Sequence, residues 1–446
     1  MAKQNKEEIL ENLIQAARKA GADAADALLV EGVSAGVSYR LGKLEDVERA
    51  ESRDLGLRVF VGARVAFVSS TDLSEDRLAE LPERAVAMAK LAPEDKYAGL
   101  APRELLARDF PSLDLEDASE PSTETLIERA KSVEGAAMAV KGITNSEGGG
   151  ASYGRTGIAL ATSEGFRGSY AATSHGIGVA VLAGEGTGME RDYAQSNARH
   201  ASDMETPDVV GKRAGERTIK RLNPRQAKSQ RAPVIYDPRV SASLVGSFAG
   251  AISGASIARG VSFLKDKMGQ AVFGPSINII DDPHRVRGLR SKPFDGEGVA
   301  NRKMALIENG VLTAWLLDTA SARQLGLTTN GHAARGTGGP PSPSTTNLYM
   351  APGKLSPEEL MADIKDGFYV TETMGFGVNG VTGDYSQGAA GFWIENGKIA
   401  YPVSGVTIAS NLKEMFLNLT PANDLEFRHG TNAPTIRVEG MTIAGS

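Results

Sequence analysis

The chain has 446 residues, of which 41% are hydrophobic and 23% are charged, which is sufficient for two soluble domains with ordinary cores. The formal net charge of −6 argues against a nucleic-acid-binding surface, and the lack of cysteine excludes disulfides, thiolate metal sites and cysteine nucleophiles. No apolar run reaches the roughly 18 to 20 residues of a membrane-spanning helix, and the N-terminus lacks the apolar core of a secretory signal, so we expect a cytoplasmic protein that binds neither membranes nor nucleic acid.

The first part of the chain alternates helical and strand-like patterns. Apolar residues at helical spacing predict a helix around residues 9–17. Residues 57–67 alternate apolar and polar side chains on both sides of a glycine, which is typical of a hairpin. A second helix is expected over residues 74–91, and the proline-rich, acidic stretch 92–121 reads as a long connection.

A similar order then repeats. The pattern predicts a helix over residues 123–140, followed by several strands between residues 143 and 195. Two Gly-containing polar segments, 145–148 and 162–165, are expected to be the turns between these strands. One more helix is expected around residues 210–218.

A domain boundary is expected within residues 221–238, where prolines and basic residues precede renewed apolar sequence. We therefore divide the chain into an N-terminal α+β domain, residues 1–225, and a β-rich C-terminal domain, residues 226–446. The fold class predicted for the whole chain is α+β, with helices and antiparallel strands first and a buried helix of small residues in the second domain.

Two β-hairpins are expected in the second domain, at Asn309-Gly310 and at Asn396-Gly397. Asn-Gly tolerates the positive φ angles that a two-residue type I′ turn requires, and both sites have strand-like flanks. Their residues are explained by the requirements of the turn, so we expect these hairpins to be structural and to have no catalytic role. Residues 331–347 are rich in Gly and Pro and are expected to form a long loop.

Residues 241–260 contain no ionisable side chain before Arg259 and many small ones. Gly246, Gly250 and Gly254 recur every four residues and would share one face of a helix, where another backbone can approach closely. Each glycine costs a helix about 1 kcal/mol relative to Ala. Spacing alone favours a small-residue helix packed in the core.

Three longer segments carry a family resemblance: IIDDPHRVRGLRSKPFDGEGVANRKMALIENG, GHAARGTGGPPSPSTTNLYM and the terminal PTIRVEGMTIAG. Over nearly its whole length the chain resembles the TldD/PmbA family, and most closely its TldE (PmbA) branch. The TldD branch is similar to zinc peptidases, with a His-Glu-x-x-x-His helix and a further ligand near the C-terminus. The resemblance implies a TldD–TldE heterodimer that cleaves unfolded peptides in an enclosed cavity.

The residues at the signature positions do not suit a metal. Laid on LVGSFAGA, the signature places Gly246 and Ala251 at the two imidazoles and Ser247 at the glutamate base. A zinc peptidase needs three protein ligands and a carboxylate base, and neither Gly nor Ala has a side-chain donor atom. We therefore expect no catalytic residue and no metal in this chain, and zinc in a TldD-like partner.

The resemblance implies that the chain completes the substrate cavity and holds an unfolded peptide as an added strand, beside a TldD-like catalytic subunit. When isolated, the chain is expected to be able to pair with a second copy of itself. The candidate cavity residues come from the small-residue helix and the Gly/Pro-rich loop: Gly246, Ser247, Gly250, Ala251, Gly254, Gly338, Gly339, Ser344 and Asn347.

Two other functions stay open at this point. One is a self-sufficient homodimeric metallopeptidase with an atypical site, built on His284 with the acidic residues 281 and 282, or on His429 with the acidic residues 424 and 426. The other is a regulatory binding protein, as an older description of the family as a modulator of DNA gyrase suggests. That function would require salt-sensitive DNA binding.

Overall fold

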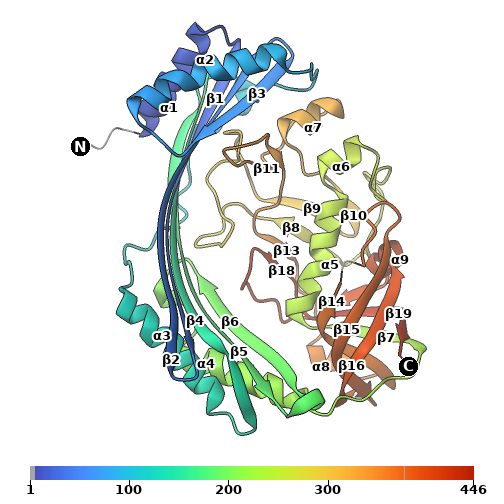
Figure 1. The fold of residues 1–446 in the computed structure, drawn as a ribbon. Helices are drawn as coiled ribbons and strands as arrows, with labels where there is room; N and C mark the ends of the chain where they lie inside the picture. Colours follow the sequence, from blue (N-terminus) through green and yellow to red (C-terminus); the bar gives the residue numbers. More distant parts are fainter. Residues whose placement is uncertain (1–5, 376, 446) are drawn as a thin grey trace.

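The computed structural model describes residues 6–375 and 377–445. Its first half is built on one long, curved antiparallel sheet of six strands in the order β3-β2-β1-β4-β5-β6 (Figure 1). The strands are β1 (Ala24–Arg40), β2 (Lys43–Val61), β3 (Arg64–Ser70), β4 (Ile143–Thr162), β5 (Arg167–Ala183) and β6 (Glu190–Ala198). The hairpin expected at residues 57–67 is confirmed as β2 and β3, joined through Gly62 with φ 59°.

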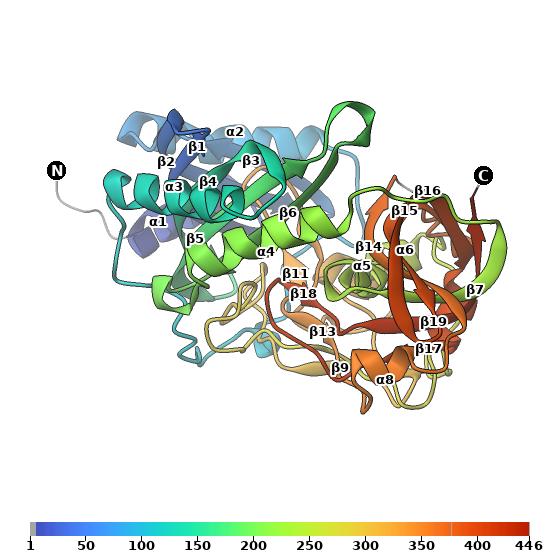
Figure 2. The same ribbon diagram turned by 90° about the horizontal axis from the view of Figure 1, so that it is seen from below.

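Two pairs of helices cover this sheet and confirm the helices predicted from periodicity. Helices α1 (Lys6–Lys19) and α2 (Glu75–Leu91) bury Leu10 and Leu81 against one end of it. Helices α3 (Thr123–Met138) and α4 (Pro207–Lys220) bury Leu126 and Val210 against the other. Figure 2 shows α3 and α4 side by side, with α5 viewed along its axis. The connection over residues 92–121 has one short 3-10 turn, Arg103–Leu105.

One predicted turn is wrong and the other is confirmed. Residues 162–165 form the turn between β4 and β5, with Gly165 at φ 92°. Residues 145–148 lie inside β4, where the register to β5 shifts twice. Their polar side chains stabilise this irregularity, since the Ser146 hydroxyl accepts a hydrogen bond from Gly148 N (2.9 Å). The polar and glycine residues that suggested a turn therefore form a β-bulge within the strand.

The second half is β-rich and confirms the α+β class. A six-stranded mixed sheet has the order β16-β15-β14-β7-β19-β17, a five-stranded sheet has the order β10-β9-β8-β13-β18, and β11 pairs with β12. The strands are β7 (Gln230–Tyr236), β8 (Ile279–Asp281), β9 (Met304–Glu308), β10 (Val311–Leu312), β11 (Ala333–Ala334), β12 (Ser342–Pro343), β13 (Leu348–Met350), β14 (Asp366–Met374), β15 (Asp384–Glu395), β16 (Lys398–Asn411), β17 (Leu419–Pro421), β18 (Thr431–Asn432) and β19 (Ile436–Ala444). The helices of this half are α5 (Pro238–Ala251), α6 (Gly254–Ala258), α7 (Thr319–Gln324), α8 (Pro357–Met361) and α9 (Leu412–Leu417). Within the described residues, no helix combines the length and apolar character needed to cross a bilayer.

Both Asn-Gly hairpins are confirmed. Asn309 and Gly310 have φ of 50° and 82° between β9 and β10, and Asn396 and Gly397 have φ of 50° and 76° between β15 and β16. Positive φ at both central residues is the type I′ conformation. The loop over residues 331–347 is largely irregular, as expected, with the short pair β11 and β12 inside it.

The small-residue segment forms two helices instead of one. Helix α5 ends at Ala251, and Ser253 then bridges to Leu316 before α6 begins. The Gly254 N–H donates to the Leu316 carbonyl at 2.7 Å, an approach that a side chain at residue 254 would obstruct. The apolar side of α5 is buried through Phe248, whose ring centroid lies 5.3 Å from that of Phe273.

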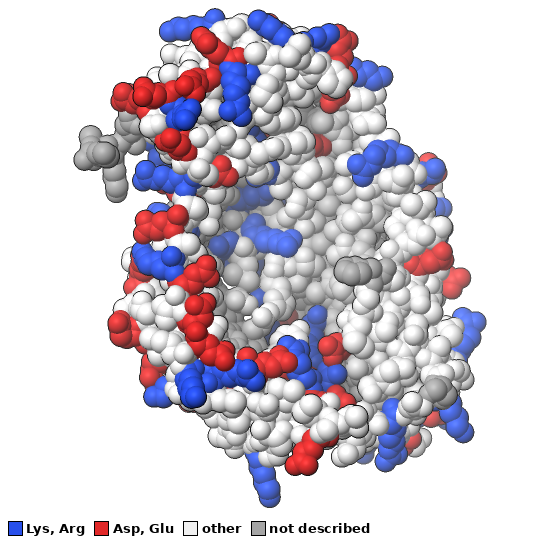
Figure 3. Space-filling view, viewed as in Figure 1, with Lys and Arg blue, Asp and Glu red and all other residues white. Residues whose placement is uncertain are grey.

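The two halves touch near both ends of the curved sheet. At one end, Arg335 of the Gly/Pro-rich loop pairs with Asp26 of β1 (Nη1–Oδ1 2.6 Å), and both are buried. Gly56 of β2 allows the same loop to approach, because a Cβ there would lie 2.3 Å from the Thr337 carbonyl oxygen. At the other end, Arg221 pairs with Glu372 (2.6 Å). Figure 3 shows a deep hollow in the surface of the molecule, with basic side chains inside.

Candidate functional site

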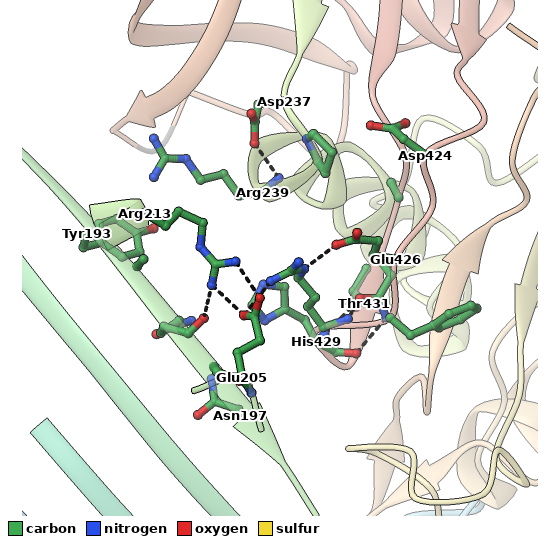
Figure 4. A pocket seen from close by; sticks show the side chains of 18 of the residues that line it. Tyr193, Asn197, Glu205, Arg213, Asp237, Arg239, Asp424, Glu426, His429 and Thr431 are labelled. Atoms are coloured by element: carbon green, nitrogen blue, oxygen red, sulfur yellow. Dashed lines mark hydrogen bonds and ion pairs between the residues drawn. The ribbon is translucent and has the colours of Figure 1, made fainter. Parts of the chain in front are cut away.

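A cleft of about 730 Å³ lies where β6 and α4 of the first half meet the start of α5 and residues 424–433 of the second (Figure 4). Its walls are mostly polar and charged, and an edge strand forms one side. The lining residues are Tyr193, Ala194, Gln195, Ser196, Asn197, Asp203, Glu205, Arg213, Arg217, Asp237, Pro238, Arg239, Tyr369, Asp424, Glu426, Phe427, Arg428, His429, Thr431, Asn432 and Ala433.

Strand β6 is an edge of the six-stranded sheet, and its residues 193–197 line the cleft. Alternate residues of an antiparallel strand direct their backbone groups away from the neighbouring strand. On this outer side, Tyr193 N donates to the Asp192 carboxylate (2.7 Å) and the Gln195 carbonyl accepts a long hydrogen bond from Arg213 (3.4 Å). These two groups are thus already bonded to side chains, and an extended chain would pair with the other backbone groups on this edge of β6.

Three arginines around the cleft are held by carboxylates. Arg239 makes two bonds to Asp192, at 2.7 and 3.0 Å. Arg213 makes two to Glu205, at 2.7 and 2.6 Å, and Arg428 adds a third to the same carboxylate at 2.9 Å. Because these pairs join β6 and α4 to the C-terminal half, they set the width of the cleft.

The carboxylate of Asp237, at the start of α5, already accepts hydrogen bonds from two neighbouring groups. It accepts hydrogen bonds from Arg239 N (3.1 Å), as the N-cap of the helix, and from the Tyr369 hydroxyl (3.1 Å). Burial raises the pKa of Tyr369, and the charge of Asp237 raises it further. Tyr369 therefore remains a neutral donor in the cleft wall.

Two titratable groups at or beside the cleft, His429 and Asp192, have shifted pKa values with identifiable causes. Burial opposes ionisation of Asp192, but the hydrogen bonds and charge of Arg239 outweigh it, so the pKa of Asp192 is lowered. Burial lowers the pKa of His429, and the positive charge of Arg428 lowers it further. An imidazole that favours its neutral form therefore lies in the cleft, and a carboxylate that favours its ionised form lies beside it.

The predicted cavity residues on α5 and α6 divide between exposed and buried positions. Gly246 and Gly250 are exposed, and a Cβ at either would meet no other atom within 4 Å. Ser247, beside them, is partly exposed, and its hydroxyl donates to the Ser243 carbonyl at 3.0 Å. Ala251 and Gly254 are buried, so they lie in the packing of the domain and do not line an open surface.

The predicted cavity residues in the loop over residues 331–347 also divide into exposed and buried positions. Gly338 and Gly339 have open space at the Cβ position, and Ser344 N donates to the His332 carbonyl at 2.7 Å. Asn347 is buried and does not face a cavity. Its amide oxygen accepts from Arg290 N (2.9 Å), and its nitrogen donates to the Asp282 carbonyl and the Ser291 hydroxyl (both 2.7 Å).

The donor groups present do not fit the zinc site of a peptidase. Ser247 has the only side-chain oxygen or nitrogen among the three signature positions, and its hydroxyl is already bonded along the helix. Within the described parts of the chain, no three His, Cys, Asp or Glu side chains are grouped so that they could hold a metal ion.

Neither atypical metal site is assembled in the described chain. The His284 ring contacts Asn301 (Nε2–Oδ1 2.7 Å). His429 shares the cleft with the acidic residues 424 and 426, but Asp424 accepts hydrogen bonds from Thr435 and Glu426 pairs with the neighbouring arginine. Each acid is therefore already engaged.

Three family models match consecutive parts of the chain: PmbA/TldA metallopeptidase domain 1 (residues 25–89), its central domain (116–222) and its C-terminal domain (229–445). The metalloprotease PmbA of Escherichia coli O157:H7 is 40% identical over 425 residues, covering 95% of this chain and 92% of that protein. This chain belongs to the PmbA/TldD family. A PmbA homologue of Haemophilus influenzae is 36% identical, covering 97% of this chain and 94% of that protein.

Solved structures agree with this PmbA/TldD fold. A Bacteroides thetaiotaomicron protein named as a candidate modulator of DNA gyrase has a TM-score of 0.92 at 24% identity, with all of both chains covered. TldE from Thermococcus kodakarensis has a TM-score of 0.87 at 22% identity, covering 98% of this chain and 99% of that one. At such low identities the likeness shows the fold alone. The division after residue 225 remains a prediction.

Sequence reasoning missed the arginines of the cleft. Arg213 and Arg217 lie four residues apart, and Arg221 follows after four more, which is a detectable signal of one helical face. The sequence around these arginines does not indicate which carboxylates they pair with, because Asp192, Glu205 and Glu372 lie in other parts of the chain.

Proposed function

We propose that this chain is the catalytically silent, TldE-like subunit of a TldD–TldE heterodimeric zinc metalloprotease that cleaves unfolded peptides. The observation that carries the proposal is the side-chain chemistry of α5: Gly246 and Ala251 have no donor atom and Ser247 has only a hydroxyl, where the family resemblance implies two imidazoles and a glutamate. A zinc-bound water needs ligands and a base that these residues lack. The 40% identity to a metalloprotease PmbA supports the family context.

The role assigned to the chain is to complete the cavity and to hold substrate. The exposed face of α5 at Gly246 and Gly250 and the edge of β6 both offer backbone that an extended peptide can approach. Main-chain pairing provides affinity that does not depend on sequence, which suits unfolded substrates. The catalytic zinc belongs to the TldD-like partner, and the assembly works in the cytoplasm.

The test compares the purified chain with a mixture of the chain and its TldD-like partner, after metal removal and zinc reloading of each. A disordered labelled peptide serves as substrate. We expect no cleavage by this chain alone and rapid cleavage by the mixture, with a one-to-one complex by mass measurement. The partner alone is the control for activity that needs no second subunit.

Strong zinc-dependent cleavage by the lone chain would overturn the proposal. Loss of stoichiometric zinc on substitution of His284 or His429 would then favour the self-sufficient metallopeptidase. Steeply salt-dependent DNA binding by the chain would instead favour a regulatory function.

A further inference from the structure

Three arginines follow one another at intervals of four along α4 and its C-cap. The first, Arg213, is held by Glu205 through two hydrogen bonds. The last, Arg221, is held by Glu372 at 2.6 Å and lies 3.4 Å from Glu190. Arg217 stands between them and forms no hydrogen bond or ion pair with any residue that the structure describes.

Arg217 is attracted by two nearby carboxylates, Asp237 and Asp192, but no hydrogen bond or ion pair to either is formed within the described chain. The nearby carboxylates of Asp192 and Asp237 are already engaged, the first by Arg239 and the second as the cap of α5. Burial lowers the pKa of Arg217 and the positive charge of Arg239 lowers it further, while the charges of Asp237 and Asp192 oppose this shift only in part. A partly buried guanidinium without a partner is costly, and its neighbours show that the fold can supply partners here.

Arg217 also stands where two cavities meet. Besides the cleft beside β6, it lines a second pocket of about 510 Å³, whose more apolar wall includes Phe392 and Tyr401. The two pockets share Arg217, Asp237, Arg239 and Tyr369. A ligand lying in the cleft can therefore reach the guanidinium while another part of it enters the apolar pocket.

We propose that Arg217 is an anion subsite that binds a carboxylate of an extended peptide lying along the edge of β6. This inference rests on the proposed function, since it names the class of peptide that the same cleft prefers. The planar guanidinium matches a carboxylate in a two-bond geometry. The carboxylate is supplied by the C-terminus of the peptide or by an Asp or Glu side chain.

Binding of labelled peptides to the full chain, without partner, tests the inference by fluorescence anisotropy. Three disordered peptides of equal length are compared: a neutral one with an amidated C-terminus, the same peptide with a free C-terminus, and an amidated one with a central Glu. We expect at least one carboxylate-bearing peptide to bind about tenfold more tightly than the neutral amide. Which of the two does so identifies the source of the carboxylate.

Matched variants assign the preference to Arg217. Arg217→Gln is expected to abolish it, and Arg217→Lys to retain only part of it, because Lys keeps the charge without the planar pair of donors. Lys212→Gln removes the same charge from an exposed position of the same helix and is expected to retain the full preference. Circular dichroism and melting temperature check that each variant is folded.

Equal or undetectable binding of all three peptides by the unmodified chain would overturn the inference, and so would an unchanged preference in Arg217→Gln. Because the assay contains no partner, its outcome is separate from the test of the heterodimer. Cleavage restored by mixing, without a carboxylate preference, would leave the subunit role standing and remove only the role of Arg217.

Discussion

Arg239, in the first turn of α5, joins Asp192 of β6 through two parallel bonds, with Nη1–Oδ1 and Nη2–Oδ2 distances of 2.7 and 3.0 Å. The two residues lie in different halves of the molecule, and only 3% of the Asp192 side chain is exposed. The pair therefore holds the curved sheet to α5.

Arg239→Leu is expected to lower the free energy of unfolding by about 3 kcal/mol, because it leaves a buried carboxylate without its main partner. Denaturant titration measures the loss. Arg77→Leu is the control, since the Arg77–Glu80 pair is exposed and its loss should change stability by less than about 0.5 kcal/mol. Similar losses in both variants would contradict a special role for the buried pair.

Asp192→Asn should show a stability loss that depends on pH. The folded state lowers the pKa of Asp192 below its usual value of 3.8, so the ionised group stabilises the fold above that value. This contribution disappears as the pH falls through the lower, folded pKa. The difference between the unmodified chain and Asp192→Asn, measured by denaturation, should therefore be largest at neutral pH. A difference that grows on acidification would contradict the assignment.

Glu297→Gln should stabilise the protein at neutral pH. Burial, followed by the charge of Asp295, raises the pKa of Glu297 from 4.5 to about 7. Below pH 4.5 the carboxyl is protonated in both states. As pH rises from 4.5 to about 7 the unfolded chain releases this proton and the folded chain retains it, so stability falls by about 2 to 3 kcal/mol.

Denaturation of the unmodified chain and Glu297→Gln on both sides of this window tests that prediction. Gln can still accept the hydrogen bonds that Thr319 donates to residue 297, at 2.8 and 2.7 Å. The advantage of the variant should be small in acid and reach its full size above pH 7. An advantage that is independent of pH would show that the carboxyl does not titrate in this range.

Arg217→Leu should change the free energy of unfolding by no more than about 0.5 kcal/mol, or raise it, because this side chain forms no ion pair with the part of the chain that the structure describes. Arg221→Leu, one turn further along, should lower it by about 2 to 3 kcal/mol, since it breaks the bond to Glu372. Residues kept for binding often contribute nothing to stability. A large loss in Arg217→Leu, measured by denaturation, would show that the residue is structural.

Gly246→Ala should stabilise α5 by about 0.5 to 1 kcal/mol, since its Cβ would enter open space. On the proposed function, it should also reduce cleavage by the mixture with the TldD-like partner, because the methyl group would occupy the face proposed to meet substrate. Gly135→Ala, on the exposed side of α3, is the matched control and should stabilise without affecting cleavage. Gly254→Ala should be destabilising, because its Cβ would lie 2.7 Å from the Leu316 carbonyl oxygen.

Equal cleavage by mixtures containing Gly246→Ala and Gly135→Ala would contradict a role for the exposed face of α5. Melting temperature provides the second measurement, because both variants should melt at or above the temperature of the unmodified chain. Comparing these two variants thus separates an effect on cleavage from an effect on folding.

Local patterns predicted most of the elements correctly. The Asn-Gly turns at Asn309 and Asn396 adopt the expected positive φ angles, since turn chemistry acts within a few residues. The same reasoning failed at residues 145–148, where pairing with β5 continues through a turn-like composition. Pairing with a neighbouring strand is a tertiary interaction, and it overrode the local preference.

The amino-acid sequence by itself determined which chemistry α5 lacks, because a missing donor atom at Gly246 or Ala251 is a property of residue type and needs no coordinates. Only the tertiary structure decided that Ala251 is buried while Gly246 faces open space, and that Arg217 has, among the described residues, no bonded partner of the kind that Arg213 and Arg221 each have. The physical reason is that burial and charge pairing depend on side chains brought together from distant parts of the chain.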